Sequence, residues 1–279
     1  MKLNLNKMLL TSAEKRNEET VNQLISLWKT VFGDSEDYIR LLVPYLPIFD
    51  CYVVKEDGKI VSAFYLLPSE IKVGKRIYKG SYLYAAATYE EYRKNGYMSY
   101  LIREAIKDKE NELDFISLVP ANDDLYSYYS RFGFEELMYN FRTRITCDSE
   151  NNKQGDIITD GERVNSLRKS NFDYLHLFTD SAMNYALSCY GHFGSHFKAL
   201  NDSAVLYVED EKTVYEGIFS EREKEDFTKL LKDSYSDEIT VLSPYSICEN
   251  SEKIKCGMIL DFSSELKNSG GVYMNHTLM

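Results

Sequence analysis

The chain has 279 residues, of which 44% are hydrophobic and 28% are charged, enough for one large globular domain or two of ordinary size. Its five cysteines are odd in number and widely spaced, so they predict no disulfide framework and favour a reduced, cytoplasmic protein. No apolar run approaches the roughly 18 residues of a membrane-spanning helix, and the N-terminus does not resemble a secretory signal, so we expect no membrane partner.

The formal net charge is −11, and the second half of the chain carries almost all of it. Residues 1–146 contain 20 basic and 21 acidic residues, whereas residues 147–279 contain 13 and 23. Nucleic acid is not expected as a partner, because binding its phosphates requires clustered cations. An acidic half would attract a cationic substrate instead, although a solvated acidic surface that aids solubility is the simpler interpretation.

The first part of the chain predicts two helices and then a meander of strands. Apolar residues recur at the helical spacing over 21–32, and Gly33 provides a stop. A second helix is expected to follow Asp34 or Ser35 and to reach Leu46. The expected strands form a hairpin of 51–54 with 60–67, a second hairpin of 70–73 with residues after 77, and a strand over 81–88.

A strand–helix–strand–helix unit is expected next. Met98, Leu101, Ile102, Ala105 and Ile106 occupy one face of a helix. The expected elements are helices over 96–113 and 122–132 and strands over 114–119 and 141–146. A meander that gains a crossover helix predicts a mixed α/β sheet.

The remaining sequence is predicted to form a second α/β domain. Residues 147–161 are polar and are interpreted as a linker between domains 1–146 and 162–279. Beyond the linker we expect mostly helix over 164–188, a hairpin of 204–208 with 214–219, a helix from Ser220 to about 235 with a capping box to Glu223, and strands over 238–242, 256–262 and 271–275.

The junction between the strand over 81–88 and the following helix is the most informative segment. It contains the basic turn Arg93-Lys94-Asn95-Gly96. Backbone N–H groups at a helix N-terminus, flanked by cations, form a site for phosphate. The sequence therefore predicts a phosphorylated cofactor, and the alternative is an ordinary strand–turn–helix with an exposed basic turn.

Two motifs at matching separation resemble the Gcn5-related N-acetyltransferase (GNAT) superfamily over about residues 20–146. Arg93-x-x-Gly96-x-Met98 resembles the family's Arg/Gln-x-x-Gly-x-Gly/Ala signature, and Tyr129 stands four residues before Gly133 in a Tyr-x-x-x-Gly-Phe motif. The sequence departs from the family at Met98, which replaces a small residue, and at Glu90, which replaces a frequent proline and which we expect to face solvent. The Ala-Ala-Thr before the turn and the Tyr-Met-Ser after it resemble Eis-like acetyltransferases, in which a catalytic domain precedes a second domain of the same fold without the signature.

The resemblance implies a GNAT fold, two tandem domains and an acetyl-CoA-dependent N-acetyltransferase that moves the acetyl group directly to an amine. It implies that backbone amides cradle the pyrophosphate while Arg93 and Lys94 add charge-assisted contacts. The implied cofactor-binding residues are Ala86, Ala87 and Thr88 along the pantetheine arm, and Arg93, Lys94, Asn95, Gly96, Tyr97, Met98, Ser99 and Asn122.

The resemblance also implies the catalytic residues. Tyr129 would protonate the departing thiolate of CoA, although it could instead belong to an aromatic packing stripe with Tyr126 and Tyr128. Asn122 would hold the pantetheine arm or order a water, or it is a plain helix N-cap. In Eis-like enzymes the C-terminal carboxylate enters the active site, which assigns that role here to Met279.

The acceptor and two alternative functions stay open. We expect a cationic small-molecule or peptide amine, such as a polyamine, an aminoglycoside-like amine or a lysine side chain, and the resemblance is compatible with a homo-oligomer. One alternative is a non-catalytic acyl-CoA-binding sensor or scaffold. The other is a tRNA-dependent aminoacyltransferase of related fold, which the acidic charge disfavours. Cys189, His192 and His196 have metal-like spacing but no evident fourth ligand, so no metal is expected.

Overall fold

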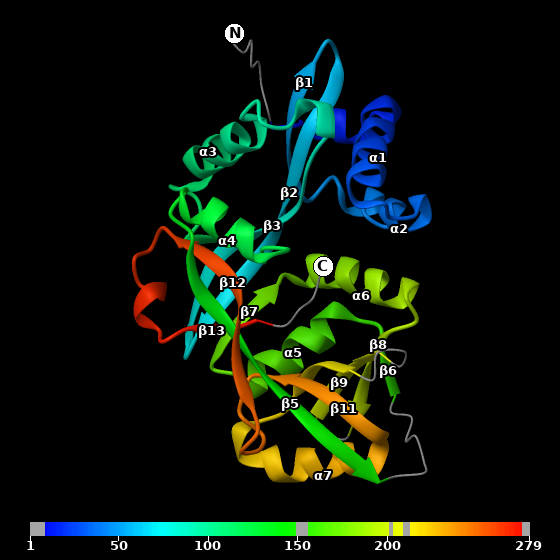
Figure 1. The fold of residues 1–279 in the computed structure, drawn as a ribbon, viewed down its shortest axis with the longest axis vertical. Coiled ribbons are helices and arrows are strands. Elements are labelled where there is room, and N and C mark those ends of the chain that lie inside the picture. The colour runs from blue at the N-terminus through cyan, green and yellow to red at the C-terminus, as the bar shows by residue number, and fades with distance from the viewer. Residues whose placement is uncertain (1–8, 149–155, 201–202, 209–212, 275–279) are drawn as a thin grey trace.

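The computed structural model describes residues 9–148, 156–200, 203–208 and 213–274, which form a mixed α/β fold with one continuous sheet (Figure 1). The elements of the first half are η1 (Glu14–Arg16), α1 (Glu18–Phe32), α2 (Glu36–Arg40), η2 (Val43–Tyr45), β1 (Asp50–Glu56), β2 (Lys59–Val73), β3 (Arg76–Thr88), η3 (Glu90–Tyr92), α3 (Tyr97–Lys109), β4 (Phe115–Leu118), α4 (Asp123–Ser130) and β5 (Glu135–Asp148). Those of the second half are β6 (Asp156–Ile158), α5 (Gly161–Asn171), β7 (Tyr174–Phe178), α6 (Asp180–His192), β8 (His196–Leu200), β9 (Ser203–Val208), β10 (Thr213–Ile218), η4 (Glu221–Glu223), α7 (Lys224–Ser234), β11 (Ser236–Ser243), β12 (Glu252–Asp261), η5 (Leu266–Asn268) and β13 (Val272–Tyr273).

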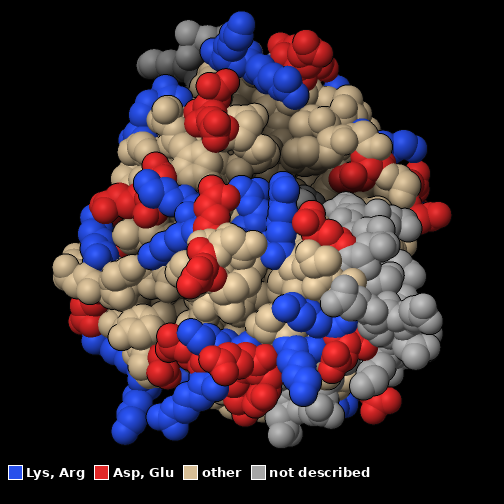
Figure 2. Space-filling view, turned by 60° about the horizontal axis from the view of Figure 1, so that its bottom comes forward, with Lys and Arg blue, Asp and Glu red and all other residues tan. Residues whose placement is uncertain are grey.

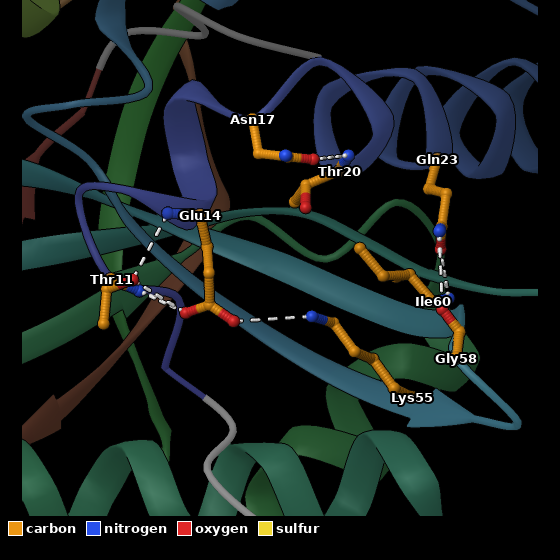
Figure 3. Close-up of polar contacts among 8 residues, drawn as sticks. All are labelled: Thr11, Glu14, Asn17, Thr20, Gln23, Lys55, Gly58 and Ile60. Carbon is orange, nitrogen blue, oxygen red and sulfur yellow. Dashed lines mark hydrogen bonds and ion pairs between the residues drawn. The ribbon is translucent and has the colours of Figure 1, made fainter.

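Local hydrogen bonds determine where α1 begins and how it sits on the sheet (Figure 3). Thr11 and Glu14 form a reciprocal pair, in which each backbone N–H is bound by the other side chain, at 2.9 and 3.2 Å. The Asn17 side chain accepts from the N–H of Thr20 at 3.0 Å and caps the helix. Gln23 then accepts from the N–H of Ile60 at 2.7 Å, which joins α1 to the tip of the β1–β2 hairpin.

Helices cover both faces of the central strands. In Figure 1, α1 and α2 lie on one side of β2 and β3, and α3 and α4 lie on the other. The second predicted helix is shorter than expected, because α2 ends at Arg40 and a 3-10 turn over Val43–Tyr45 replaces its second half. Pro44 explains the break, since proline lacks an N–H and disfavours helical geometry in the residue before it.

The strands after α2 are longer than the sequence predicts. The Asp57-Gly58 hairpin turn is confirmed, with φ angles of 48° and 81°. However, 60–67 and 70–73 belong to one strand, β2, which continues through Pro68. On one edge of β2, pairing with β1 ends at Leu66 and pairing with β7 begins at Ser69, so Pro68 lies in a gap where no ladder hydrogen bond is required.

Two expectations for the second half are wrong. Residues 174–178, inside the predicted helical region 164–188, form β7, a strand of only five residues that is buried from Leu175 onward on both faces. The predicted capping box is absent, because the Ser220 hydroxyl donates to the Glu223 carboxylate at 2.6 Å and α7 begins only at Lys224. The predicted hairpin is confirmed as β9 and β10.

A strand near the end of the chain completes the sheet of the first half. β12 lies between β4 and β5 and pairs antiparallel with both. A Cβ at Gly257 of β12 would overlap Met138 and approach the Leu118 carbonyl oxygen to 2.9 Å, so the close fit requires glycine there. With β12 in place, the strands β12, β4, β3, β2, β7, β13 and β5 form a closed ring.

Each half contains the same run of elements. β1, β2, β3, α3 and β4 correspond in order and pairing to β8, β9, β10, α7 and β11, since each run is two antiparallel pairs followed by a helical crossover to a parallel strand. A large apolar core spans both halves, and a smaller one lies under α7. The predicted mixed α/β fold is confirmed, whereas the boundaries 1–146, 147–161 and 162–279 stay predictions.

Candidate active site

The first half of the sheet opens where β3 and β4 diverge. The two strands pair in parallel only at Gly80–Tyr82 with Phe115–Ser117, and β3 then continues to Thr88 alone on that edge among the described residues. A Cβ at Gly80 would overlap the Phe115 ring, so the strands touch closely at the foot of the opening. Above this point, backbone N–H and C=O groups of β3 face a space with no strand partner.

A β-bulge bends β3 inside this opening. Tyr84 pairs with Tyr65 and Ala87 pairs with Ala63, so Ala85 and Ala86 stand opposite a single residue of β2. Ala85 has φ of 50°, a strained value for a residue with a side chain. A bulge next to a strand opening is a common way to aim backbone groups at a ligand. Sequence reasoning did not identify Ala85, because a run of alanines carries no signal for positive φ.

The predicted phosphate turn lies at the end of the same strand. Gly96 is the N-cap of α3 with φ of 82°, and no side chain caps the helix. The first intrahelical bond runs from the N–H of Tyr100 to the Gly96 carbonyl at 2.9 Å, which leaves the N–H groups of Tyr97, Met98 and Ser99 without an intrahelical partner. A Cβ at Gly96 would find no atom within 4 Å, so the approach to these N–H groups is open.

The cationic residues of the turn are exposed, as their proposed contact with phosphate requires. Arg93 donates from Nε to the Thr88 carbonyl oxygen at 3.2 Å, which ties the turn to β3 and leaves its terminal nitrogens for a ligand. Lys94 adopts φ of 64°, and the Asn95 amide donates to the Tyr92 carbonyl oxygen at 3.2 Å. Glu90 is exposed, as expected from the sequence.

The side chains of the first turn of α3 hold the helix in place. Tyr97 is 2% exposed, and its hydroxyl donates to the Glu56 carboxylate of β1. Met98 is half-buried and packs against the core, whereas the family's signature has a small residue at this position. The Ser99 hydroxyl lies 3.0 Å from the Tyr128 hydroxyl, which fixes α4 against α3. These residues therefore present their backbone, and not their side chains, to the open end of the helix.

Asn122 and Tyr129 are placed by α4. The Asn122 side chain accepts from the N–H of Leu125 at 3.2 Å, so the N-cap interpretation is confirmed. Tyr129 is 7% exposed and packs edge-on against Tyr128 and Phe134, with ring centroids 5.2 and 5.9 Å away. Burial, reinforced by Tyr128, raises the pKa of the Tyr129 hydroxyl, which keeps it protonated and able to donate a hydrogen.

The foot of the opening is filled by a polar but uncharged group of side chains. Tyr82 of β3 lies near Tyr129, and burial followed by that neighbour raises the pKa of its hydroxyl. His176 of β7 is 1% exposed and lies 2.9 Å from the Ser117 hydroxyl. Burial lowers the pKa of His176 to about 3, with the Arg168 charge contributing, so the imidazole is neutral. Neither residue was singled out from the sequence, because each contact joins elements far apart in the chain.

The remaining residues considered from the sequence either lie outside the described residues or belong to α6 and β8. Met279 lies outside the described residues, so its role stays a prediction. Cys189 is buried on α6, whereas His192 is exposed, and the described part of the chain contains no group of three metal-binding side chains. On the face drawn in Figure 2, basic and acidic side chains are interspersed and form no continuous basic surface. No helix in the described ranges is long and apolar enough to cross a bilayer.

A strand opening, a bulge and an uncapped helix N-terminus after a basic turn define an acyltransferase of the GNAT class. Consistent with this, residues 13–137 match the family model described as "Acetyltransferase (GNAT) domain". Residues 13–137 therefore form a GNAT acetyltransferase domain. The predicted resemblance is thereby confirmed. A search of curated proteins by sequence finds no match to the chain.

Solved structures share the fold over most of the chain. A probable N-acyltransferase of unknown function from Enterococcus faecalis V583 is 13% identical with a TM-score of 0.69, over 92% of this chain and 73% of that one. Eis1 from Mycobacterium abscessus is 9% identical with a TM-score of 0.65, over 92% and 74%. A GCN5-related N-acetyltransferase from Kribbella flavida is 14% identical with a TM-score of 0.63, over 92% and 72%. At these identities the likeness establishes the fold alone.

Proposed function

We propose that the chain is an acetyl-CoA-dependent N-acetyltransferase that moves an acetyl group directly to an amine. The observation that carries the proposal is the N-terminus of α3, which no side chain caps and which follows the strand β3 directly after its edge parts from β4. The exposed cations Arg93 and Lys94 flank it and match the charge of a pyrophosphate. The free edge of β3 at Ala86, Ala87 and Thr88 can form hydrogen bonds with the amides of a pantetheine arm, as it would with a neighbouring strand.

Cleavage of the thioester requires a general acid that protonates the departing sulfur. The amine nitrogen attacks the carbonyl carbon, the carbon–nitrogen bond forms, and the carbon–sulfur bond breaks. Tyr129 donates its proton to the departing thiolate, since its hydroxyl stays protonated at neutral pH. The attacking amine must lose a proton, and the C-terminal carboxylate of Met279 is our candidate for the acceptor of that proton.

We further propose that the acceptor is a cationic amine, supported by the excess of ten negative charges in residues 147–279. The test combines thiol release from acetyl-CoA over a panel of polyamines, aminoglycosides and lysine peptides with calorimetric binding of acetyl-CoA. We expect binding, and turnover with at least one amine. Binding without turnover on any amine would favour the acyl-CoA sensor instead, and absence of binding would overturn the proposal.

Extending the chain tests the candidate base separately. A few residues added after Met279 should lower turnover strongly without changing acetyl-CoA affinity, because the carboxylate would be displaced. Unchanged turnover would eliminate Met279 from the mechanism.

A further inference from the structure

Two arginines stand on the outer surface where α3 meets α4, beside the open end of α3. The guanidinium of Arg131 lies over the Tyr128 ring at 4.8 Å from the centroid, and that of Arg103 lies over the Phe132 ring at 5.3 Å. The two rings are themselves in contact, edge to face, at 5.3 Å. The two contacting aromatic rings thus form one platform that carries both arginines.

The platform restricts the motion of both side chains. Arg131 also donates from Nε to the Tyr128 carbonyl oxygen at 3.4 Å. A guanidinium stacked on an aromatic face keeps its donors in the plane and free at the edge. Less side-chain freedom is then lost when an anion binds, which favours recognition of a phosphate.

Both charges are also available. Arg103 and Arg131 are exposed, and no described carboxylate forms an ion pair with either. The acidic residues of α4, Asp123 and Asp124, lie in its first turn, at the opposite end of the helix from Arg131.

The platform is joined to the proposed pyrophosphate site through the side chain of Tyr128. Tyr128, which carries Arg131, bonds at 3.0 Å to Ser99, whose N–H belongs to the open end of α3. In coenzyme A the pyrophosphate and a phosphate monoester are attached to the same ribose, at its 5′ and 3′ oxygens. A ligand whose pyrophosphate binds the first turn of α3 would therefore carry its second phosphate within one ribose of that turn, a range in which the platform beside Ser99 lies.

We infer that Arg103 and Arg131, held on the Tyr128–Phe132 platform, bind the 3′-phosphate of coenzyme A and make the protein selective for CoA over 3′-dephospho-CoA. The inference rests on the proposed function, because it assumes that CoA binds at α3. A phosphate monoester with about two negative charges accepts charge-assisted hydrogen bonds from both guanidiniums.

Calorimetric titration of the full chain with CoA and with 3′-dephospho-CoA tests the inference without an acceptor amine. The wild-type chain should bind CoA about tenfold more tightly or better. In R103Q/R131Q the affinity for CoA should fall to that for 3′-dephospho-CoA, while the latter stays unchanged. R131K keeps the charge but loses the planar fork, so we expect part of the selectivity to remain.

The control is R222Q, which removes an exposed arginine from the second half and should change neither affinity. Melting curves of the single variants R103Q and R131Q show whether either change disturbs folding. Equal binding of both ligands by the wild-type chain, or equal weakening of both in R103Q/R131Q, would overturn the inference and leave the proposed function standing. Absence of binding by either ligand would overturn the proposed function itself.

Discussion

The crossover from β3 through α3 to β4 and the crossover from β10 through α7 to β11 share one topology. Each begins on a strand with a bulge, at Ala85–Ala86 in β3 and at Tyr215 in β10. Each returns to a parallel strand that pairs over only two or three residues. Backbone topology alone therefore does not distinguish a GNAT site from a structural repeat of it.

The turns differ in conformation and not in net charge, since each combines two glutamates with one arginine and one lysine, at residues 90–94 and 221–224. The first contains Arg93, Lys94 and the left-handed Gly96, and it opens the end of α3. In the second, the Ser220 hydroxyl donates to Glu223, and Glu223 is the N-cap of α7 with φ of −100° in place of a left-handed glycine.

The space beside the strand also differs. Phe227 of α7 stacks on Phe219 at 4.1 Å and would lie 2.8 Å from a Cβ at Gly217, so ring carbons occupy the second crossover. Just after the bulge, Glu216 forms a fully buried pair with Arg168 at 2.6 Å. Burial raises the pKa of Glu216, and the Arg168 charge opposes that rise. Side chains therefore fill the second crossover, whereas β3 in the first keeps, in the described part of the chain, an unpaired edge beyond Tyr82.

The largest expected effect concerns the acid of the first unit, which has no equivalent in the second. Tyr129→Phe keeps the ring packed on Phe134 and removes the hydroxyl, so thiol release with the best amine should fall about 10²–10⁴-fold. Acetyl-CoA affinity should stay the same. Tyr126→Phe on the same helix is the control, and a similar loss in both variants would assign Tyr129 to packing.

Truncating one side chain in each crossover helix tests whether the second crossover is packed more tightly than the first. Phe227 and Tyr100 are the fourth residues of α7 and α3. Phe227→Ala should lower the free energy of unfolding by about 3–5 kcal/mol, because the ring is 2% exposed. Tyr100→Ala, at a half-buried position, should cost about 1 kcal/mol or less in the same denaturant titration. Equal losses would show that the second crossover is no better filled than the first.

The pH dependence of stability tests the contact that joins β7 of the second half to the first. The unfolded state takes up a proton on His176 below pH 6.5, whereas the buried imidazole has a pKa of about 3. Its contribution is complete above pH 6.5 and is lost as the pH falls, by about 2–3 kcal/mol at pH 4.5. His176→Gln should flatten this fall in denaturant titrations, and the exposed His192→Gln is the matched control. A variant that keeps the full pH dependence would contradict the burial of His176.

Whether a feature could be predicted from the sequence depends on how far apart along the chain its interacting residues lie. The Asp57-Gly58 hairpin, the basic turn and the helix after Gly96 all follow from residues a few positions apart, and these predictions are confirmed. The buried strand β7 is only five residues long, and β12 finds its partners more than a hundred residues away, so neither arrangement had a strong local signal. The positive φ of Ala85 arises from the surrounding sheet and not from its own residue type.

The smallest expected effect, a change in stability, distinguishes the two roles considered for Asn122, helix N-cap and ligand contact. Asn122→Ala should cost about 1 kcal/mol of stability by removing the cap of α4. Asn122→Asp keeps a capping oxygen, so stability should return while the amide donor stays absent. Normal acetyl-CoA affinity in Asn122→Asp would limit the residue to capping, whereas weaker binding would place its amide on the ligand.

Calorimetric titration of acetyl-CoA against paired turn variants tests the central claim most directly. Arg93→Ala with Gly96→Glu removes a cation, strains the left-handed position and adds a negative charge, so affinity should fall at least about a hundredfold. Arg222→Ala with Ser220→Glu makes the matching changes in the second turn and should leave affinity unchanged. Normal affinity in the first variant, or loss of binding in the second, would contradict a single site at α3.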